Sequence, residues 1–181
     1  EWNGQRFVEA AHPLNEALPG TPVIPAELAE VFPDGFQTEV SPGAVEWWQV
    51  AASKLQGGRL MAIDYGLLAD EFLHPERSRG TARAYSRHRL LDDILLNPGQ
   101  QDLTCHVNFS TIMQAGEQSG LITDFCGTQA TFLTRILEKQ MADGAPSWTR
   151  QEIGQFQTLT HPAHLGTKFK VLVQATEARR K

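Results

Sequence analysis

Residues 57–66, GGRLMAIDYG, decide the fold class of this chain. The four consecutive apolar residues 60–63 predict a β-strand that is covered on both faces, as in a parallel sheet. The glycines that precede the strand can end a helix, and Gly66 ends the strand itself. Asp64 and Tyr65 stand at the carboxyl end of the strand, which is the edge where open α/β sheets bind their ligands.

Helical and strand-like patterns alternate around this strand. Side-chain oxygens suited to cap a helix precede the helical patterns, and glycines end two of them. The order helix, buried strand, helix, strand, two helices and strand is typical of a layered α/β protein. The expected elements are a helix from Ser41, a helix between Asn108 and Gly120, a strand at Leu121–Phe125, helices capped by Thr128 and Thr149, and a strand at Lys168–Thr176.

Two segments lack this regularity. Residues 1–40 combine an Asn3-Gly4 turn signal with several prolines, which predicts a hairpin followed by an irregular connection. Residues 67–104 form a long connection in which a short helix is expected near Arg89–Leu96. A connection of that length in a compact domain usually has a function or a structure of its own.

The composition excludes several classes of protein. The 181 residues are 41% hydrophobic, which is enough for a core. There are 16 basic and 21 acidic residues, and the net charge of −5 disfavours nonspecific nucleic-acid binding. No apolar run approaches the ~20 residues of a membrane-spanning helix, so no membrane insertion is expected. The two cysteines, Cys105 and Cys126, cannot build a disulfide scaffold and suggest a reducing compartment.

Two segments near the predicted ligand edge carry polar side chains suited to binding. Asp64, Tyr65 and Gly66 can face a ligand, although the aspartate could equally cap a turn and the tyrosine fill the sheet edge. Residues 77–89, RSRGTARAYSRHR, contain five arginines and His88 without an acid. This segment suits an acidic partner surface or nearby carboxylates, and a solvated basic loop is the simpler interpretation.

A third segment combines an acid, a hydroxyl and an imidazole. Asp102, Thr104 and His106 alternate along the chain, so they share one face of an extended segment. These groups could bind or deprotonate a polar substrate, and an ordinary approach to a helix cap is an equally good interpretation. The pair His161 and His164 has no further ligands nearby, so no metal site is expected.

Four segments together resemble one known family. They are SPGAVEWW, GGRLMAIDYG, RGTARAYSRHRLLDDILLNPGQQDLTCHVNFSTI and LGTKFKVLVQ, and they occur in the family's order between residues 36 and 174. The family is the MidA-like S-adenosylmethionine-dependent methyltransferases, which include the mitochondrial complex I assembly methyltransferase. Asn108 stands where the family commonly has aspartate, and both residues can cap a helix.

The resemblance implies an α/β fold that is the C-terminal portion of a Rossmann-like, seven-stranded class I methyltransferase sheet with a helical insertion. Arg59–Tyr65 would be the fifth strand, Leu121–Phe125 the sixth and Lys168–Thr176 the seventh. Residues 1–40 would be a hairpin and Pro-rich insertion. Residues 41–181 would be the C-terminal half of the methyltransferase domain.

The resemblance also implies an incomplete cofactor site. The family's glycine-rich loop, its acidic residue for the ribose and its Asn-Glu motif lie upstream of the matched segments, so the residues that bind S-adenosylmethionine are expected mostly outside this chain. The chain begins without methionine, and we expect it to be a piece of a longer protein. The strand at Leu60–Ile63 would lose a neighbour, which would partly uncover its hydrogen-bonding groups and both of its apolar faces. Its edge is therefore expected to pair with the missing N-terminal half or a second copy, or to be replaced by a rearrangement.

The activity implied by the resemblance is methylation of a protein arginine linked to assembly of respiratory complex I, in a bacterial cytoplasm or a mitochondrial matrix. A carboxylate must orient the protonated guanidinium of such an acceptor. This chain alone is expected to be inactive, and the alternative function is a non-catalytic assembly or interaction module. The candidate residues are Asp64, Asp102 and His106 for catalysis, and Tyr65, Gly66, Arg83, Tyr85 and Thr104 for binding the substrate.

Overall fold

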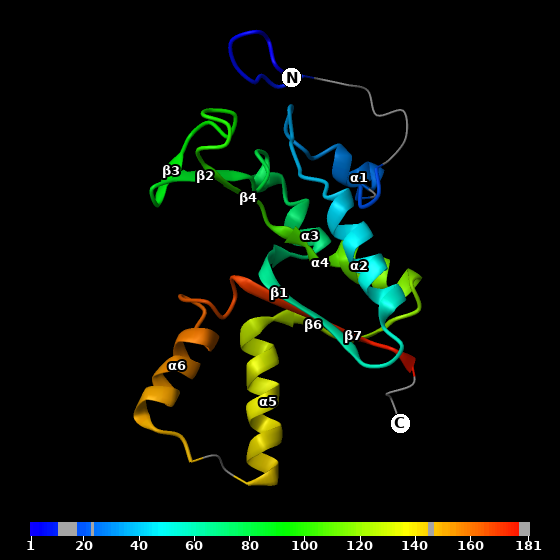
Figure 1. The fold of residues 1–181 in the computed structure, drawn as a ribbon, viewed down its shortest axis with the longest axis vertical. Helices are drawn as coiled ribbons and strands as arrows, with labels where there is room; N and C mark the ends of the chain where they lie inside the picture. Colours follow the sequence, from blue (N-terminus) through cyan, green and yellow to red (C-terminus); the bar gives the residue numbers. More distant parts are fainter. Residues whose placement is uncertain (11–17, 23, 145–146, 178–181) are drawn as a thin grey trace.

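The computed structural model describes residues 1–10, 18–22, 24–144 and 147–177. Its main sheet has the strand order β5-β1-β7-β6 (Figure 1). Strand β7 runs antiparallel to both of its neighbours, β1 and β6, whereas β5 runs parallel to the end of β1. The sheet is therefore mixed, in an α/β protein as expected. The strands are β1 (Arg59–Leu67), β5 (Val107–Asn108), β6 (Ile122–Thr128) and β7 (Phe169–Ala175).

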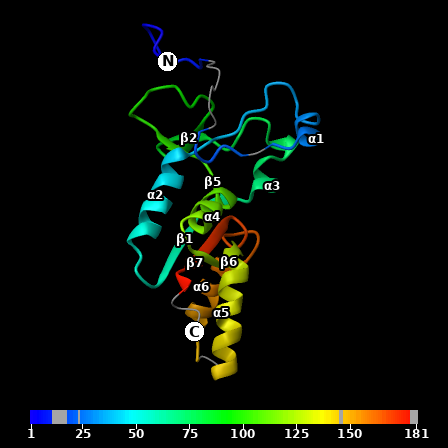
Figure 2. The same cartoon turned by 90° about the vertical axis from the view of Figure 1, so that its right-hand side faces the viewer.

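Helices lie on both sides of this sheet, with α2 and α4 on one side and α5 and α6 on the other (Figures 1 and 2). The predicted caps of three helices are confirmed, because Asn108, Thr128 and Thr149 each accept a hydrogen bond from a backbone N–H of the first turn. The fourth cap differs: Ser41 precedes the helix but makes no side-chain cap bond. The helices are α2 (Pro42–Lys54), α4 (Phe109–Gln118), α5 (Gln129–Asp143) and α6 (Arg150–Thr160).

A fully buried glutamine connects the sheet to the helices above it. The side-chain oxygen of Gln174 in β7 accepts a hydrogen bond of 2.7 Å from the indole N–H of Trp48 in α2. Its amide nitrogen donates to the Met113 carbonyl at 2.8 Å and to the Thr123 hydroxyl at 2.9 Å. Every polar atom of this side chain is therefore paired, as burial requires. A Cβ on Gly116 of α4 would overlap both Gln174 and Trp48, so the helix packs here without a side chain.

The expectation that the strand at Arg59–Tyr65 is covered on both faces is wrong. Leu60 and Ala62 pack against the core, but Met61, Ile63 and Tyr65 on the other face are 53%, 46% and 46% exposed. Strand β7 is the one covered on both faces, because it lies between two strands with helices on either side. The outer edge of β1 pairs with β5 only at its last two residues. Within the described chain the rest of that edge has no strand beside it.

The expected helix near Arg89–Leu96 is also wrong. Its first residues form β3 (Arg89–Leu91), in a second sheet with β2 (Arg83–Ser86) and β4 (Asp102–Thr104), ordered β3-β2-β4. Ser86 pairs with Arg89, which leaves a two-residue turn whose φ angles of 49° at Arg87 and 62° at His88 are those of a type I′ hairpin. Pairing with a neighbouring strand thus overrides the local helical pattern. The connection also contains α3 (Ala69–Phe72) and the 3-10 helix η1 (Pro75–Arg77).

The N-terminal hairpin signal produces only one bridge, between Trp2 and Phe7, whose rings meet edge to face. The turn between them has four residues, and the Asn3 side chain accepts hydrogen bonds from two of its N–H groups. After it comes the short helix α1 (Ala26–Ala29), while residues 11–17 of the predicted Pro-rich connection and the final residues 178–181 lie outside the described chain. No helix in the described ranges is long and apolar enough to cross a membrane.

Candidate functional site

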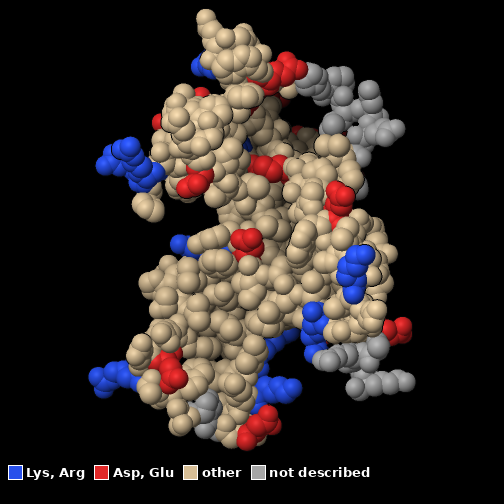
Figure 3. Space-filling model, in the orientation of Figure 1, with Lys and Arg blue, Asp and Glu red and all other residues tan. Residues whose placement is uncertain are grey.

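An open cavity of about 1030 Å³ lies between the carboxyl end of β1 and the small sheet. Figure 3 shows the surface hollowed between the upper and lower parts of the molecule, with side chains of both charges in the hollow. Residues from β1, β2 and β4 line this cavity. The structure brings seven of the eight predicted site residues into its lining: Asp64, Tyr65, Gly66, Arg83, Tyr85, Thr104 and His106.

The eighth predicted residue, Asp102, is not among the residues that line this cavity. It lies opposite Tyr85 in the pairing of β2 with β4, and its side chain is exposed. Thr104 shares the same strand but lies opposite Arg83, nearer to β1. The alternation of Asp102, Thr104 and His106 therefore places only the last two in the cavity.

His106 and Tyr65 form the aromatic wall of the cavity. The Tyr65 ring packs against Phe169 at 4.2 Å between centroids and meets the His106 ring edge-on at 6.5 Å. Burial lowers the pKa of His106 below its usual 6.5, as do the positive charges of Arg77 and Arg83. Its buried Nδ1 has no hydrogen-bond partner in the part of the chain that the structure describes. The imidazole is therefore neutral at pH 7.

Asp64 supplies a carboxylate next to Tyr65 in the cavity lining. The side chain is exposed, and one of its oxygens accepts a hydrogen bond of 2.7 Å from the Tyr65 N–H. No hydrogen bond from the described residues reaches the second oxygen, so it can face a ligand. Burial, with the nearby charges of Glu39 and Asp64, raises the pKa of the Cys105 thiol, so this cysteine is not the activated thiolate of a nucleophilic site.

Gly66 has a packing role rather than a demonstrable ligand contact. It pairs with Val107 of β5, and a Cβ at this position would overlap the Phe109 ring and the Val107 carbonyl. Only glycine lets β1 approach the start of α4 this closely. The close approach brings the carboxyl end of β1 beside His106, which directly precedes Val107.

Arg83 lies along the rim of the cavity. Its guanidinium donates to the Ala82 carbonyl at 2.6 Å, which turns it back onto its own strand. Arg77 and Lys168 also line the cavity, and sequence reasoning did not single out either as a site residue. The cavity therefore has three cations, while its two carboxylates are Asp64 and Glu71.

A carboxylate that the sequence did not single out, Glu39, organises the neighbouring loop. One oxygen accepts the N–H groups of Thr81 and Ala82, both at 2.6 Å, and the other accepts the Thr81 hydroxyl at 3.0 Å. Gly80 has φ of 61°, and a side chain there would overlap Glu39. No local signal marks Glu39, because its partners are backbone N–H groups and a hydroxyl that lie 42 and 43 residues further along the chain.

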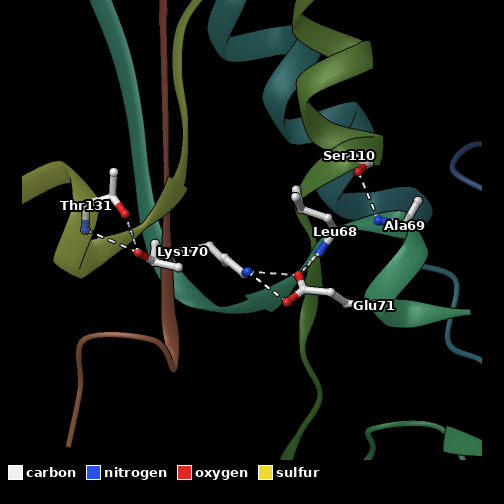
Figure 4. Close-up of polar contacts among 7 residues, drawn as sticks. Leu68, Ala69, Glu71, Ser110, Thr131 and Lys170 are labelled. Atoms are coloured by element: carbon white, nitrogen blue, oxygen red, sulfur yellow. Dashed lines mark hydrogen bonds and ion pairs between the residues drawn. The ribbon is translucent and has the colours of Figure 1, made fainter. Parts of the chain in front are cut away.

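A buried lysine connects the main sheet to the floor of the cavity. Nζ of Lys170 in β7 lies 2.8 Å from one Glu71 oxygen and 3.0 Å from the other (Figure 4). The same carboxylate accepts the Leu68 N–H at 2.8 Å, which begins α3. Burial acts to raise the pKa of Glu71, but this hydrogen bond and the charges of Lys170 and Arg77 outweigh it and lower the pKa.

We expect Glu71→Gln to destabilise the protein at neutral pH and to make its free energy of unfolding less dependent on pH under acidic conditions. A lowered pKa in the folded state means that the carboxylate stabilises the protein above its ordinary pKa of 4.5, and that this stability is lost as the pH falls below 4.5. The loss at pH 7 should be about 1–2 kcal/mol, less than for a fully buried pair because the Glu71 side chain is 37% exposed. Urea unfolding of both proteins at pH 7 and pH 4 measures it. A constant difference between the two proteins across this range would contradict the prediction.

The fold and the cavity define an α/β protein with a polar site at the carboxyl end of a sheet strand, lined by a neutral imidazole, a phenol and a carboxylate. Residues 3–126 match a protein family described as "Putative S-adenosyl-L-methionine-dependent methyltransferase". The chain belongs to this methyltransferase family, as its sequence motifs predicted.

Named relatives and solved structures agree with this membership. The chain is 31% identical over 160 residues to the mitochondrial protein arginine methyltransferase NDUFAF7 homolog of Drosophila melanogaster, and 28% identical over 139 residues to the zebrafish (Danio rerio) protein of the corresponding name. These matches cover 82% and 72% of this chain but only 33% and 31% of the relatives. A Burkholderia thailandensis crystal structure with bound S-adenosyl-homocysteine superposes with a TM-score of 0.73 at 29% identity, over 96% of this chain and 45% of that one.

The pair Gly57 and Gly58 does not fit the glycine-rich turn of an S-adenosylmethionine site. A glycine-rich turn that contacts such a cofactor follows a sheet strand, whereas Gly57 and Gly58 precede β1. The cavity instead offers groups suited to bind a polar acceptor and remove its proton. Among the described residues there is also no group of three His, Cys, Asp or Glu side chains that could hold a metal ion.

Proposed function

We propose that this chain forms the acceptor-binding part of an S-adenosylmethionine-dependent methyltransferase that acts on a protein arginine. The observation that carries the proposal is the meeting of Asp64, Tyr65 and His106 in one cavity at the carboxyl end of β1. The names of the two relatives, both protein arginine methyltransferases, support arginine as the acceptor. The seven-stranded methyltransferase sheet, of which β1, β6 and β7 would be the last three strands, is part of the same proposal.

The residues of this chain suit the demands of a guanidinium acceptor. Because arginine is protonated at neutral pH, it needs a carboxylate to orient it, and Asp64 has an oxygen available. The proton then needs an acceptor, and the neutral imidazole of His106, a residue of the cavity lining, would take it. Tyr65 and Tyr85 would hold the planar group between them at the wall. S-adenosylmethionine, when bound, supplies an electrophilic methyl group.

The methyl donor would be held by the part of the relatives that this chain does not span. That part would lie against the outer edge of β1 and cover its exposed face, where Met61 and Ile63 are open to solvent. A second copy of this chain is the alternative occupant of that edge. We place the complete protein in a bacterial cytoplasm or a mitochondrial matrix, since relatives of both origins match.

The exposed face of β1 gives a prediction about assembly. The chain alone should associate or bind its upstream part, and Ile63→Lys should weaken that association, because it places a charge on the surface to be buried. Size-exclusion chromatography with light scattering measures this, with Ile136→Lys, on the exposed side of α5, as the matched control. If the chain is a monodisperse monomer and does not bind the upstream part, the exposed face of β1 is not an association surface.

Calorimetric titration with S-adenosyl-homocysteine tests the function itself. We expect binding by the complete gene product that contains these residues, and no binding by the 181-residue chain alone. Methylation of arginine in a protein acceptor, followed by mass spectrometry, then identifies the reaction. Absence of cofactor binding by the complete protein would overturn the proposal.

The excess of cations in the cavity favours one second candidate, a non-catalytic interaction module. Arg77, Arg83 and Lys168 would attract an acidic segment of a partner, and the type I′ turn carries two further exposed basic residues, Arg87 and His88. This function needs no cofactor. The same calorimetric titration separates the two candidates, because an interaction module would bind no S-adenosyl-homocysteine in any form.

A further inference from the structure

We infer that Glu39 is a positioning residue for His106 and that it acts through the hydroxyl of Thr81. The inference rests on the proposed function in one respect, which is that His106 accepts the proton of the substrate. The residues concerned are far apart in sequence, since Glu39 precedes α2, Thr81 precedes β2 and His106 precedes β5. Their contact is therefore a product of the fold rather than of local structure.

Glu39 determines the direction of the Thr81 hydroxyl. Its carboxylate already accepts the Thr81 and Ala82 N–H groups, which fixes it in place, and its second oxygen accepts the hydroxyl proton at 3.0 Å. Thr81 is only 4% exposed, so no water competes freely for this proton. Hydrogen bonds to a carboxylate are stronger than those between neutral groups. The lone pairs of the hydroxyl oxygen are consequently directed away from Glu39.

The oriented hydroxyl in turn holds the backbone of His106. Oγ1 of Thr81 accepts the His106 N–H at 3.0 Å, and the next residue, Val107, pairs with Gly66 of β1. His106 is thus fixed from both sides, on one by the Thr81 hydroxyl and on the other by the main sheet. None of these bonds uses the ring, so Nδ1 stays without a partner among the described residues while the ring keeps its edge-on contact with Tyr65.

A purely structural role for Glu39 makes a different prediction. If Glu39 only braced the loop, its removal would lower stability and shift the His106 pKa through the lost charge, without a specific change at the His106 backbone. In the positioning role, the His106 amide also exchanges faster and the ring moves, because the hydroxyl that holds this amide loses its direction. Burial, Arg77 and Arg83 lower the pKa of His106, while Glu39 and Asp64 raise it. The thiol of Cys105 is a further titratable neighbour, and it is uncharged at neutral pH because burial raises its pKa; the Tyr65 ring also lies against the imidazole.

The test uses histidine-labelled full chain, with the His106 resonances followed by NMR from pH 4 to pH 9. In Glu39→Gln, an amide replaces the hydroxyl's acceptor, so we expect the His106 midpoint to fall and its ring shifts to move, with His161 and His164 as internal controls. In Thr81→Val, which loses the hydroxyl, the His106 amide proton should exchange about tenfold faster or more. Thr81→Ser keeps the hydroxyl and should restore the wild-type spectrum of His106.

The inference would be overturned if the His106 midpoint and the exchange of its amide proton were unchanged in Glu39→Gln and Thr81→Val. It would also be overturned if the His106 amide exchanged as fast in Thr81→Ser as in Thr81→Val. If Glu39→Gln does not fold, Glu39→Asp, which keeps the charge on a shorter side chain, takes its place and should also speed exchange of the His106 amide proton, while the Thr81 variants test the hydroxyl separately. Methyl transfer by the complete protein is measured separately. A His106 response without any loss of methyl transfer would refute the role of His106 in the proposed function and leave the positioning by Glu39 intact.

Discussion

Gln174→Leu is expected to lower the free energy of unfolding by about 2–4 kcal/mol. Leucine is similar in size to glutamine, so the packing volume changes little and the loss comes from polar atoms left unpaired. The Trp48 indole N–H loses its acceptor, and the Met113 carbonyl and the Thr123 hydroxyl lose their donor. Urea unfolding of the full chain measures the effect.

A double-mutant cycle with Trp48→Phe tests this explanation. Alone, Trp48→Phe leaves the Gln174 oxygen unpaired and a small cavity, at a cost of about 2 kcal/mol. Combined with Gln174→Leu, it removes donor and acceptor together. The double variant should therefore lose about 1 kcal/mol or more less free energy of unfolding than the two single variants added together. Gln49→Leu, on the exposed side of the same helix, is the control and should change stability by less than about 0.5 kcal/mol. Strict additivity would refute the account.

Much of the main sheet and its helices could be predicted, because their signals are local. Caps such as Asn108 and the Thr149–Glu152 pair act within one turn, and an apolar strand bounded by glycines needs no information from elsewhere. The family resemblance assigned three of the strands to the fifth, sixth and seventh positions of the family's sheet. Which face of β1 is covered depends on the segments that pack against it. The sequence of the strand alone does not determine this.

The small sheet and the Glu39 contact were missed for the opposite reason. Arg89–Leu91 becomes a strand through pairing with β2 across a turn of Arg87 and His88, two residues that rarely adopt positive φ. Glu39 meets Thr81 only after the intervening chain has folded back. In the same way, the two-residue spacing predicted that Asp102 and His106 share one face of the segment. It did not predict that Asp102 lies outside the cavity lining. Long-range pairing sets the limit of the cavity.

Asp64→Asn in the complete protein is expected to lower methyl transfer about a hundredfold or more, whereas Asp102→Asn should change it by less than about threefold. Both changes replace a carboxylate by an amide of the same shape. The side-chain oxygen of the asparagine introduced by Asp64→Asn can still accept the Tyr65 N–H, so the end of β1 should keep its conformation. What disappears is the negative charge in a cavity that also has Arg77, Arg83 and Lys168 in its lining. Without it, those cations would repel a protonated guanidinium.

The paired substitution separates this role from a general effect of charge. Asp102 is exposed on the small sheet, outside the cavity lining, so its loss changes the net charge equally but leaves the acceptor wall intact. Initial rates at saturating S-adenosylmethionine, with unfolding curves for both variants, make the comparison. Because the pKa of His106 lies below its usual 6.5, the imidazole stays mostly neutral down to pH 6.5, and the difference between the variants should persist over that range. Equal losses in the two variants, or a loss in Asp102→Asn alone, would remove Asp64 from the acceptor site.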